Sequence, residues 1–446
     1  MPPLDWSGIN DETLRHLQGL IRLDTTNPPG NETLAADYLA RVLRTEGFEP
    51  HVLESAPGRG NVVTRLKGSG EAPPLLLYGH LDVVGAEPEH WQHPPFAAEV
   101  VDGFLWGRGT ADMKGTVAQQ LAVLLTLKRE RVPLKRDVIF AATADEEAGG
   151  SYGMEWLAQH HPDLIRAEFA LSEVGGYNLD FDGKPVYMIQ VAEKGVCWLK
   201  IRAKGRPGHG SQPHDDNAVV HVARAVDRLA TQGLPYFVCD AAGAFLQAAS
   251  RTVGGELGET LQKLSSVQAG PQALESLQAH PLYGFLNALL HNTAVPTGLA
   301  AGYKANVIPG EAEATIDGRK LPGFDTEAFL AQVKAVVGSA IECEIIRDSP
   351  SVQTRSDTPL FALMAQALQR HDPEAAGVLP YMMSGGTDAK HLTPLGMATY
   401  GFSPVKLPPG FRFMDLIHAH NERVPVAGLA WGTQVLYDVV KEYCQR

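Results

Sequence analysis

Short apolar runs that end next to acidic or imidazole side chains recur along the first half of the chain. The runs Pro74–Tyr78, Val138–Ala142 and Phe169–Leu171 have the length and composition of buried strands. Helix patterns separate them, so the sequence predicts an α/β fold with a mostly parallel, helix-covered sheet. In open sheets of this kind, ligand sites gather beyond the carboxyl ends of the strands. The polar residues at these ends are therefore expected to face one crevice.

The polar residues at these positions are of the kinds that bind metal ions. They are His80, Asp82, Asp112, Asp145, Glu146, Glu147, Glu173 and, far downstream, His418. Such a set can hold two divalent cations and still leave one carboxylate to act on water.

Helix signals flank these positions. A helix is expected to begin after Asn31 as its N-cap and to end before Gly47. Another is predicted from about residue 115 to residue 128, which places Asp112 at or near a helix N-terminus.

Each of these residues also has a purely structural interpretation. His80 fits a buried strand-end histidine that bonds to the backbone, and Asp112 fits an acid favoured by a helix dipole. Glu146 and Glu147 fit a solvated turn. Their position after an apolar strand and before two glycines disfavours the turn, because adjacent like charges there would gain from a cation.

The pattern changes after about residue 193. Alternating strands are predicted at 197–203 and 311–317, with a helix over 325–337, which is typical of a smaller α+β domain with one solvated face. The stretch 241–299 carries no readable pattern. Since the first pattern resumes later, the predicted domains are a catalytic domain formed by 1–193 and 353–446 and a domain inserted in it, 194–352.

Composition excludes several classes of function. The 446 residues suggest two or three domains, and the net charge of −13 argues against nucleic acid or anionic membranes as partners. The cysteines form no paired motif, which is typical of reduced thiols in the cytoplasm. The start of the chain has no signal-peptide pattern, and no apolar stretch is long enough to span a membrane. We therefore expect a soluble, cytoplasmic protein.

The sequence argues against a phosphate-binding loop. The Gly107-Arg108-Gly109 stretch lacks the lysine or third glycine that phosphate-binding loops need.

Eight ordered segments together resemble the M20 family of metallopeptidases and amidohydrolases. The resemblance spans about residues 10–440, and the family includes carboxypeptidases, aminoacylases, acetylornithine deacetylase and succinyl-diaminopimelate desuccinylase. The segments are LLLYGHLDVV (75–84), LWGRGTADMKG (105–115), TADEEAGG (143–150), SEVGG (172–176), GHGSQP (208–213), NVIPGEAEATIDGR (306–319), SGGTDA (384–389) and HAHNE (418–422).

The resemblance implies a site with two divalent ions, zinc first, with cobalt or manganese as alternatives. It also implies that the inserted domain is a lid through which two copies of the chain associate as a homodimer. The family pattern of His, two residues and Asn-Glu selects His418 over His420. The implied ligands are His80 on one metal, Asp112 between the two, Glu147 and Glu173 in the carboxylate shell, and His418 on the second metal.

Two further carboxylates have implied roles in catalysis. Glu146 is expected to act as the general base, taking a proton from water and returning it to the leaving amine. Asp82 is expected to accept a hydrogen bond from the other imidazole nitrogen of His80 and so to fix its tautomer.

The resemblance places substrate-binding residues outside the metal set. His209 would contact the scissile carbonyl, and a guanidinium such as that of Arg319 suits a substrate carboxylate. The alternatives are an exposed loop histidine and an arginine paired with Asp317 or Glu313. The complete set is His209, Asn306, Arg319, Gly386 and Thr387.

The expected activity is hydrolysis, by a metal-activated water, of the amide bond of a dipeptide or N-acyl amino acid with a free carboxylate. One alternative is a deacylase of the acetylornithine or succinyl-diaminopimelate type. Another, from a different class, is a noncatalytic protein that binds metal or peptide. Such a protein would lack the base or a ligand, whereas this chain retains Glu146 and all five expected ligands.

Overall fold

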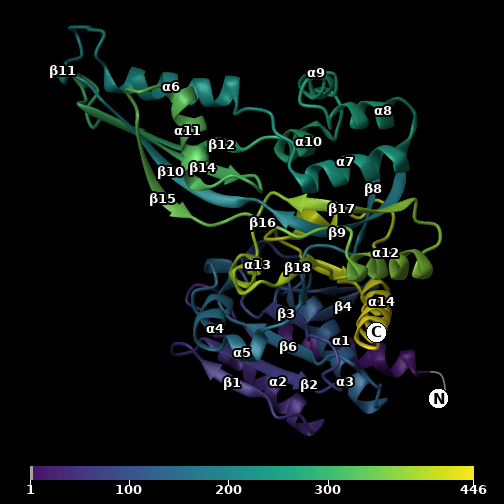
Figure 1. Ribbon diagram of the computed structural model, residues 1–446. Helices are drawn as coiled ribbons and strands as arrows, with labels where there is room; N and C mark the ends of the chain where they lie inside the picture. Colours follow the sequence, from purple (N-terminus) through teal and green to yellow (C-terminus); the bar gives the residue numbers. More distant parts are fainter. Residues whose placement is uncertain (1–3) are drawn as a thin grey trace. The chain divides into compact units, whose positions relative to one another are not determined.

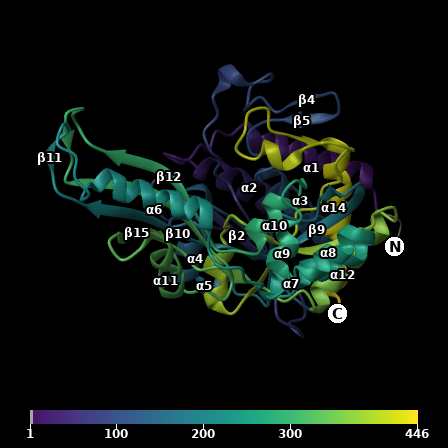
Figure 2. The ribbon, with the colours of Figure 1, turned by 90° about the horizontal axis from the view of Figure 1, so that it is seen from above.

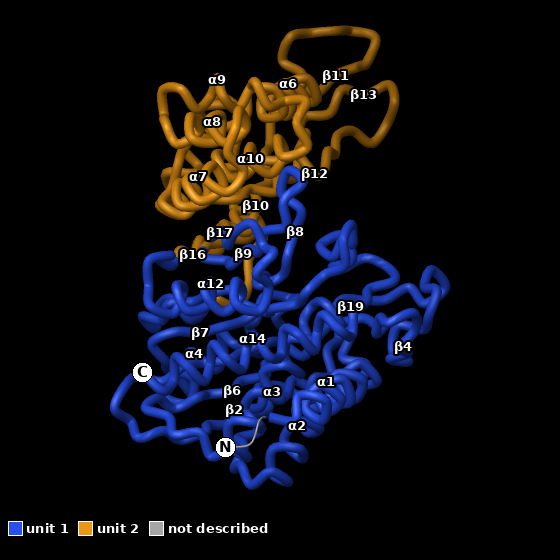
Figure 3. The backbone as a smooth tube through the Cα atoms, turned by 90° about the vertical axis from the view of Figure 1, so that its right-hand side faces the viewer, with its two compact units in different colours: residues 1–191, 354–380, 391–446 blue, residues 192–353, 381–390 orange. Residues whose placement is uncertain are grey.

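The computed structural model describes residues 4–446, which form two compact units (Figure 3). Among the described residues, unit 1 comprises 4–191, Thr354–Pro380 and His391–Arg446, and unit 2 comprises Ala192–Gln353 and Tyr381–Lys390. Residues 381–390 were expected in the second part of the catalytic domain, but they cluster with unit 2. The roles of catalytic domain and lid stay predictions for these two units.

Unit 1 is built on a mixed sheet in the order β1-β2-β6-β3-β7-β18-β9. The central strands β6, β3, β7 and β18 run parallel, while β1, β2 and β9 are antiparallel to their neighbours. The predicted α/β class with a parallel centre is confirmed. The strands are β1 (His51–Glu54), β2 (Gly60–Leu66), β3 (Leu75–His80), β6 (Val138–Thr143), β7 (Phe169–Ser172), β18 (Ala398–Gly401) and β9 (Lys184–Glu193), with β8 (Asn178–Phe181) and β17 (Gly377–Met383) pairing with β9.

Helices cover both faces of this sheet (Figure 1). Every residue of β3 and β6 is buried, because side chains on both sides of these strands meet helices. Helix α3 contacts β3 and β6 on one side and α1 and α14 on the other, so it is buried almost all round. The helices are α1 (Trp6–Ile21), α2 (Thr33–Thr45), α3 (Lys114–Arg129), α4 (Met154–His160), α5 (Pro162–Ile165), α12 (Pro359–His371), α13 (Ala389–Leu392) and α14 (Val426–Cys444).

Helix α2 begins one residue later than expected. Its N-cap is Glu32, so the prediction of Asn31 in that position is wrong. The end is as expected: Gly47 follows the helix with a φ of 73°, a left-handed conformation that glycine adopts without strain.

A small sheet joins two segments that are far apart in the sequence. It has the order β19-β5-β4, where the strands are β4 (Glu99–Val101), β5 (Phe104–Trp106) and β19 (Arg423–Pro425). The pairing of Arg423 with Trp106 places the loop after β5 beside the segment before β19. This pairing brings the Asp112 loop and the His418 segment together.

Unit 2 contains an antiparallel sheet in the order β12-β14-β10-β15. Residues of β10 alternate between buried and half-buried, as expected for a sheet with one covered face. Helix α6 runs along the sheet in Figures 1 and 2 and packs with α11 over its apolar side. The elements are β10 (Gly195–Lys204), β12 (Thr293–Ala301), β14 (Glu311–Lys320), β15 (Glu342–Asp348), α6 (Ala218–Gln232) and α11 (Thr326–Val337), with β11 (Gly208–His209) paired to β13 (Val307–Ile308) and β16 (Val352–Gln353) paired to the end of β9.

The stretch that carried no readable pattern is largely helical. Three of its helices have nine residues or fewer, which leaves too few turns for a clear apolar repeat. They are α7 (Asp240–Val253), α8 (Gly255–Lys263), α9 (Gly270–Glu275) and α10 (Tyr283–Leu289). Across residues 4–446, no helix combines the length and the apolar character needed to cross a membrane.

Candidate metal centre

The carboxyl ends of three neighbouring parallel strands carry much of the candidate site. His80 is the last residue of β3, and Glu173 directly follows β7. The segment Asp145–Glu147 comes two residues after the end of β6. Because β3 lies between β6 and β7, these residues share one edge of the sheet.

Two groups of side chains there have a geometry that could hold metal ions. The first group is His80, Asp112 and Glu173, whose ligand atoms all lie within 4.8 Å of one another. His80 Nε2 lies 3.1 Å from Asp112 Oδ1 and 3.7 Å from Glu173 Oε2.

The second group is Asp112, Glu147 and His418. His418 Nε2 lies 3.2 Å from Asp112 Oδ2 and 3.0 Å from Glu147 Oε2. Asp112 thus presents one carboxylate oxygen to each group, which is the arrangement of a bridging ligand. The other oxygen of Glu147, Oε1, is buried without a hydrogen-bond partner.

The hydrogen bonds of His80 fit a cation at the first group. Its Nδ1 lies 3.0 Å from the backbone carbonyl of Asp82, and a carbonyl can only accept, so Nδ1 carries a proton. In the neutral ring, Nε2 then has a lone pair that faces two carboxylates. That contact is unfavourable unless a proton or a cation lies between them. Imidazole nitrogen with carboxylate oxygen is a donor set that zinc accepts.

The pKa values of His418, Glu173 and Asp112 also indicate that positive charge is favourable in this cluster. Hydrogen bonds to Asp112 and then Glu147 raise the pKa of His418 to about 10. Burial, followed by the charge of Asp112, raises the pKa of Glu173 to about 8. Burial alone would raise the pKa of Asp112, but His418 and His80 together lower it. The cluster therefore holds protons that bound cations would displace.

A fully buried carboxylate positions the loop that carries Asp112. Glu422 Oε1 accepts hydrogen bonds from the backbone N–H groups of Ala111 (2.7 Å) and Asp112 (3.1 Å). Its Oε2 accepts from Arg108 (2.8 Å) and from the N–H of Gly109 (3.0 Å). Glu422 therefore couples the Asp112 loop to the segment that carries His418.

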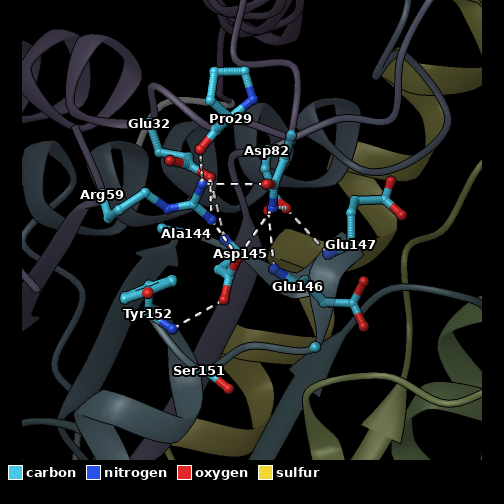
Figure 4. A network of polar contacts seen from close by, with 12 residues as sticks. Pro29, Glu32, Arg59, Asp82, Ala144, Asp145, Glu146, Glu147, Ser151 and Tyr152 are labelled. Carbon is cyan, nitrogen blue, oxygen red and sulfur yellow. Dashed lines mark hydrogen bonds and ion pairs between the residues drawn. The ribbon is translucent and has the colours of Figure 1, made fainter. Parts of the chain in front are cut away.

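Asp82 holds the turn that carries Glu146 and Glu147. Its two oxygens accept hydrogen bonds from the backbone N–H groups of these residues, each at 3.1 Å (Figure 4). The Asp82 carboxylate lies 3.5 Å from His80 Nδ1, whereas the backbone carbonyl of Asp82 lies 3.0 Å from the same nitrogen. The backbone carbonyl is therefore the nearer acceptor for the His80 ring. Figure 4 also shows the side chains of Glu146 and Glu147 pointing away from the buried contacts around Asp82.

Backbone in the left-handed region recurs beside the candidate ligands. Asp145, Val174 and His418 have φ values of 70°, 60° and 61°. This conformation is a genuine outlier for a β-branched residue such as Val174. Strained backbone of this kind clusters at functional sites, where the surrounding contacts hold it.

Buried Glu32 lies in the network behind the turn and leads to a prediction about pH. Burial, followed by the charge of Asp82, raises the pKa of Glu32 to about 7, whereas an unfolded glutamate ionises near 4.3. Between these values only the unfolded chain releases the proton, so the free energy of unfolding falls as the pH rises through this window. Glu32→Gln removes this loss, and we expect it to stabilise the protein by about 2 to 4 kcal/mol more at pH 8 than at pH 4.

Urea unfolding of the wild-type protein and the variant at both pH values measures this difference. Glu71→Gln, a change of an exposed glutamate, is the matched control. An equal effect of Glu32→Gln at the two pH values would contradict the prediction.

The expected substrate-binding residues lie in unit 2. His209 is exposed, with its Nδ1 2.8 Å from Ser211 Oγ, and strand pairing places it opposite Val307, next to Asn306. Arg319 makes a two-pronged ion pair with Asp317 at 2.6 and 3.0 Å, which occupies its guanidinium.

Gly386 and Thr387 also belong to unit 2. The backbone N–H of Thr387 donates to Glu193 Oε2 at 2.9 Å, and its hydroxyl donates to the same oxygen at 2.8 Å. The backbone N–H and the hydroxyl of Thr387, one of the expected substrate-binding residues, are therefore both bonded within the protein.

Sequence reasoning missed the residues that support the site from behind. Asn27, Glu32 and Arg59 lie in loops or at a helix start, and their spacing carries no periodic signal. Glu422 could have been found, because it ends the HAHNE segment. His420 lies in neither ligand group and makes a 2.8 Å contact with Glu87 instead.

Comparison with known proteins supports the resemblance to the M20 family. Residues 76–442 match the model of peptidase family M20/M25/M40. The chain is 29% identical over 444 residues to human N-fatty-acyl-amino acid synthase/hydrolase PM20D1, and the aligned region covers 94% of this chain and 85% of the relative. It is 28% identical over 427 residues to pig (Sus scrofa) aminoacylase-1, covering 93% of this chain and 91% of the relative.

The fold also matches a solved structure. The M20 family metallo-carboxypeptidase Sso-CP2 from Sulfolobus solfataricus superimposes with a TM-score of 0.74, at 18% identity, over 97% of this chain and 99% of that one. At this level of identity the match shows a shared fold.

Proposed function

The chain belongs to peptidase family M20/M25/M40, and from this premise we propose that it hydrolyses the amide bond of a dipeptide or an N-acyl amino acid with a free carboxylate. The observation that carries the proposal is the placement of Asp112, whose two oxygens lie against two different groups of imidazole and carboxylate. The names of the relatives support the substrate class, since they include an aminoacylase and an N-fatty-acyl-amino acid hydrolase.

The proposed ligands are those that the geometry groups together. His80 and Glu173 would hold one ion, His418 and Glu147 the other, and Asp112 both. Zinc is the first choice, with cobalt or manganese as alternatives, because metal identity also follows availability. When bound, two such ions polarise a carbonyl and make a water more acidic.

Glu146 is the proposed general base. It precedes the ligand Glu147 on a turn that Asp82 holds by both backbone amides, so its position is tied to that of the metal group. Its carboxylate would take one proton from the attacking water. As the bond between the acyl carbon and nitrogen breaks, it would return that proton to the leaving amine, while the hydroxyl stays on the acyl carbon.

Unit 2 supplies the proposed contacts to the substrate. His209 and Asn306 are exposed neighbours, so their donors are accessible to a ligand. Arg319 would serve a substrate carboxylate only by releasing Asp317. Exposed Val295 and Leu299 on the edge strand β12 support association of two copies through this unit.

A substrate panel with metal exchange tests the proposal. The protein loaded with zinc, cobalt or manganese is assayed on dipeptides and on N-acetyl, N-succinyl and long-chain N-acyl amino acids. We expect turnover of at least one class, its loss after chelation, and its return when metal is restored. Absence of turnover on every compound by the metal-loaded protein would refute the proposal and favour a protein that only binds metal or peptide.

A further inference from the structure

A buried polar network in unit 1 connects Arg59 to the turn that carries the proposed base (Figure 4). Arg59 is 5% exposed, and its guanidinium contacts four groups. It donates hydrogen bonds to Asn27 Oδ1 (3.2 Å), the carbonyl of Pro29 (2.7 Å) and Asp145 Oδ1, and it forms an ion pair with Glu32 Oε1 (3.1 Å). Of the basic side chains, only arginine has a planar fork with enough donors to bond all of them.

The network continues from Arg59 to the backbone of Glu146 and Glu147. Asn27 accepts from Arg59 and donates to Asp82 Oδ2 at 2.8 Å and to Asp145 Oδ1 at 3.1 Å. Asp82 then accepts from the two amides of the turn. Asp145 begins this turn in the left-handed conformation, and its Oδ2 accepts from the N–H of Tyr152 at 3.0 Å. Asp145 is therefore bonded to the guanidinium directly, and the amides of Glu146 and Glu147 are linked to it through Asp82 and Asn27.

The charges of the network require this arginine. Two buried acidic side chains, those of Glu32 and Asp145, contact this guanidinium directly, and buried Asp82 is joined to it through Asn27. Without it, Asp145 would be a buried charge without a cation, which is strongly destabilising for the local conformation. The turn would relax, and Glu146 would move with it.

We propose that Arg59 is a positioning residue for Glu146: through Asn27 and Asp145 it holds the turn that presents the base. The proposal rests on the proposed function, because it assigns a catalytic consequence to Glu146. A displacement of about 1 Å in a catalytic group can lower the rate about 100-fold.

Arg59→Met keeps the volume of the side chain and removes its donors, and Arg59→Lys keeps the charge but not the fork. We expect Arg59→Met to lower kcat about 10- to 100-fold per folded molecule and to change KM less than about 3-fold. Arg59→Lys should give an intermediate loss. The matched control is Arg65→Met on β2, since Arg65 pairs with Asp137 and makes no contact within the network; it should keep the wild-type kcat.

Hydrogen exchange at the amides of Glu146 and Glu147 provides a measurement that needs no activity. We expect exchange at least about 10-fold faster in Arg59→Met and unchanged exchange in Arg65→Met. If Arg59→Met does not fold, Arg59→Lys decides by the same two measurements. Wild-type kcat per folded molecule together with unchanged exchange would overturn the proposal. If the wild-type protein turns over no substrate, the proposed function fails by itself, and the exchange data still show whether Arg59 holds the turn.

Discussion

Replacing Glu146 by glutamine is expected to lower kcat about 1000-fold, within the range of 100- to 10,000-fold typical of general acid–base catalysis. Glutamine keeps the size of the side chain and the backbone amide that donates to Asp82, so the turn should remain in place. It cannot accept a proton from water. The metal content should therefore equal that of the wild-type protein, because Glu146 lies in neither ligand group.

Steady-state kinetics and elemental analysis of the purified variant check both parts of this prediction. Glu155→Gln is the matched control, since Glu155 lies nine residues later on α4 and bonds to Ser151 and Gln159. The control should keep wild-type kcat. A Glu146→Gln protein with unchanged kcat would exclude Glu146 as the base, and one that had lost its metal would make Glu146 a ligand.

Replacing Asp112 by alanine is expected to remove both metal ions and to lower kcat by at least about 1000-fold. The reason is geometric: each of its two oxygens belongs to a different ligand group. A 1000-fold lower kcat corresponds to a loss of several kcal/mol of charge stabilisation in the transition state, because each 1.36 kcal/mol of activation free energy changes the rate tenfold.

A variant of a residue that belongs to only one ligand group makes the test specific. His418→Ala affects only the second group, so it should leave about one ion per chain where Asp112→Ala leaves none. Asp11→Ala, in an exposed position on α1, is the control and should keep both ions. Full metal content in Asp112→Ala would show that this residue does not bridge the two groups.

The buried strands were predictable because their chemistry is local. The run Pro74–Tyr78 is apolar throughout, and in the structure β3 is buried along its whole length between two layers of helices. A titratable residue within two positions of the end of such a run is detectable in the sequence, which is why His80 and Glu173 could be named. The antiparallel edges of the sheet were not predicted, since strand direction depends on which segments pair.

Other parts of the site could not be predicted, because the neighbouring sequence contains no pattern that indicates their contacts. Arg59 and Asn27 are polar residues in loops, and the sequence does not reveal that both are buried around Asp145. For Arg319, the sequence could state the pairing with Asp317 only as an alternative, because the rotamer decides between a neighbouring acid and a substrate. The N–H of Thr387 is likewise occupied by Glu193, which lies 194 residues away in the chain.

The α/β class, the kinds of side chain at the strand ends and the family can be read from the amino-acid sequence, because apolar periodicity and short motifs are properties of neighbouring residues. The three-dimensional arrangement was needed to show that Asp112 presents one oxygen to each ligand group and that Glu422 holds its loop. The same is true of the guanidinium of Arg59, which bonds to Asp145 at the start of the turn that carries Glu146. These features depend on distances between segments up to 314 residues apart, and such distances are set by strand pairing and packing of the whole unit.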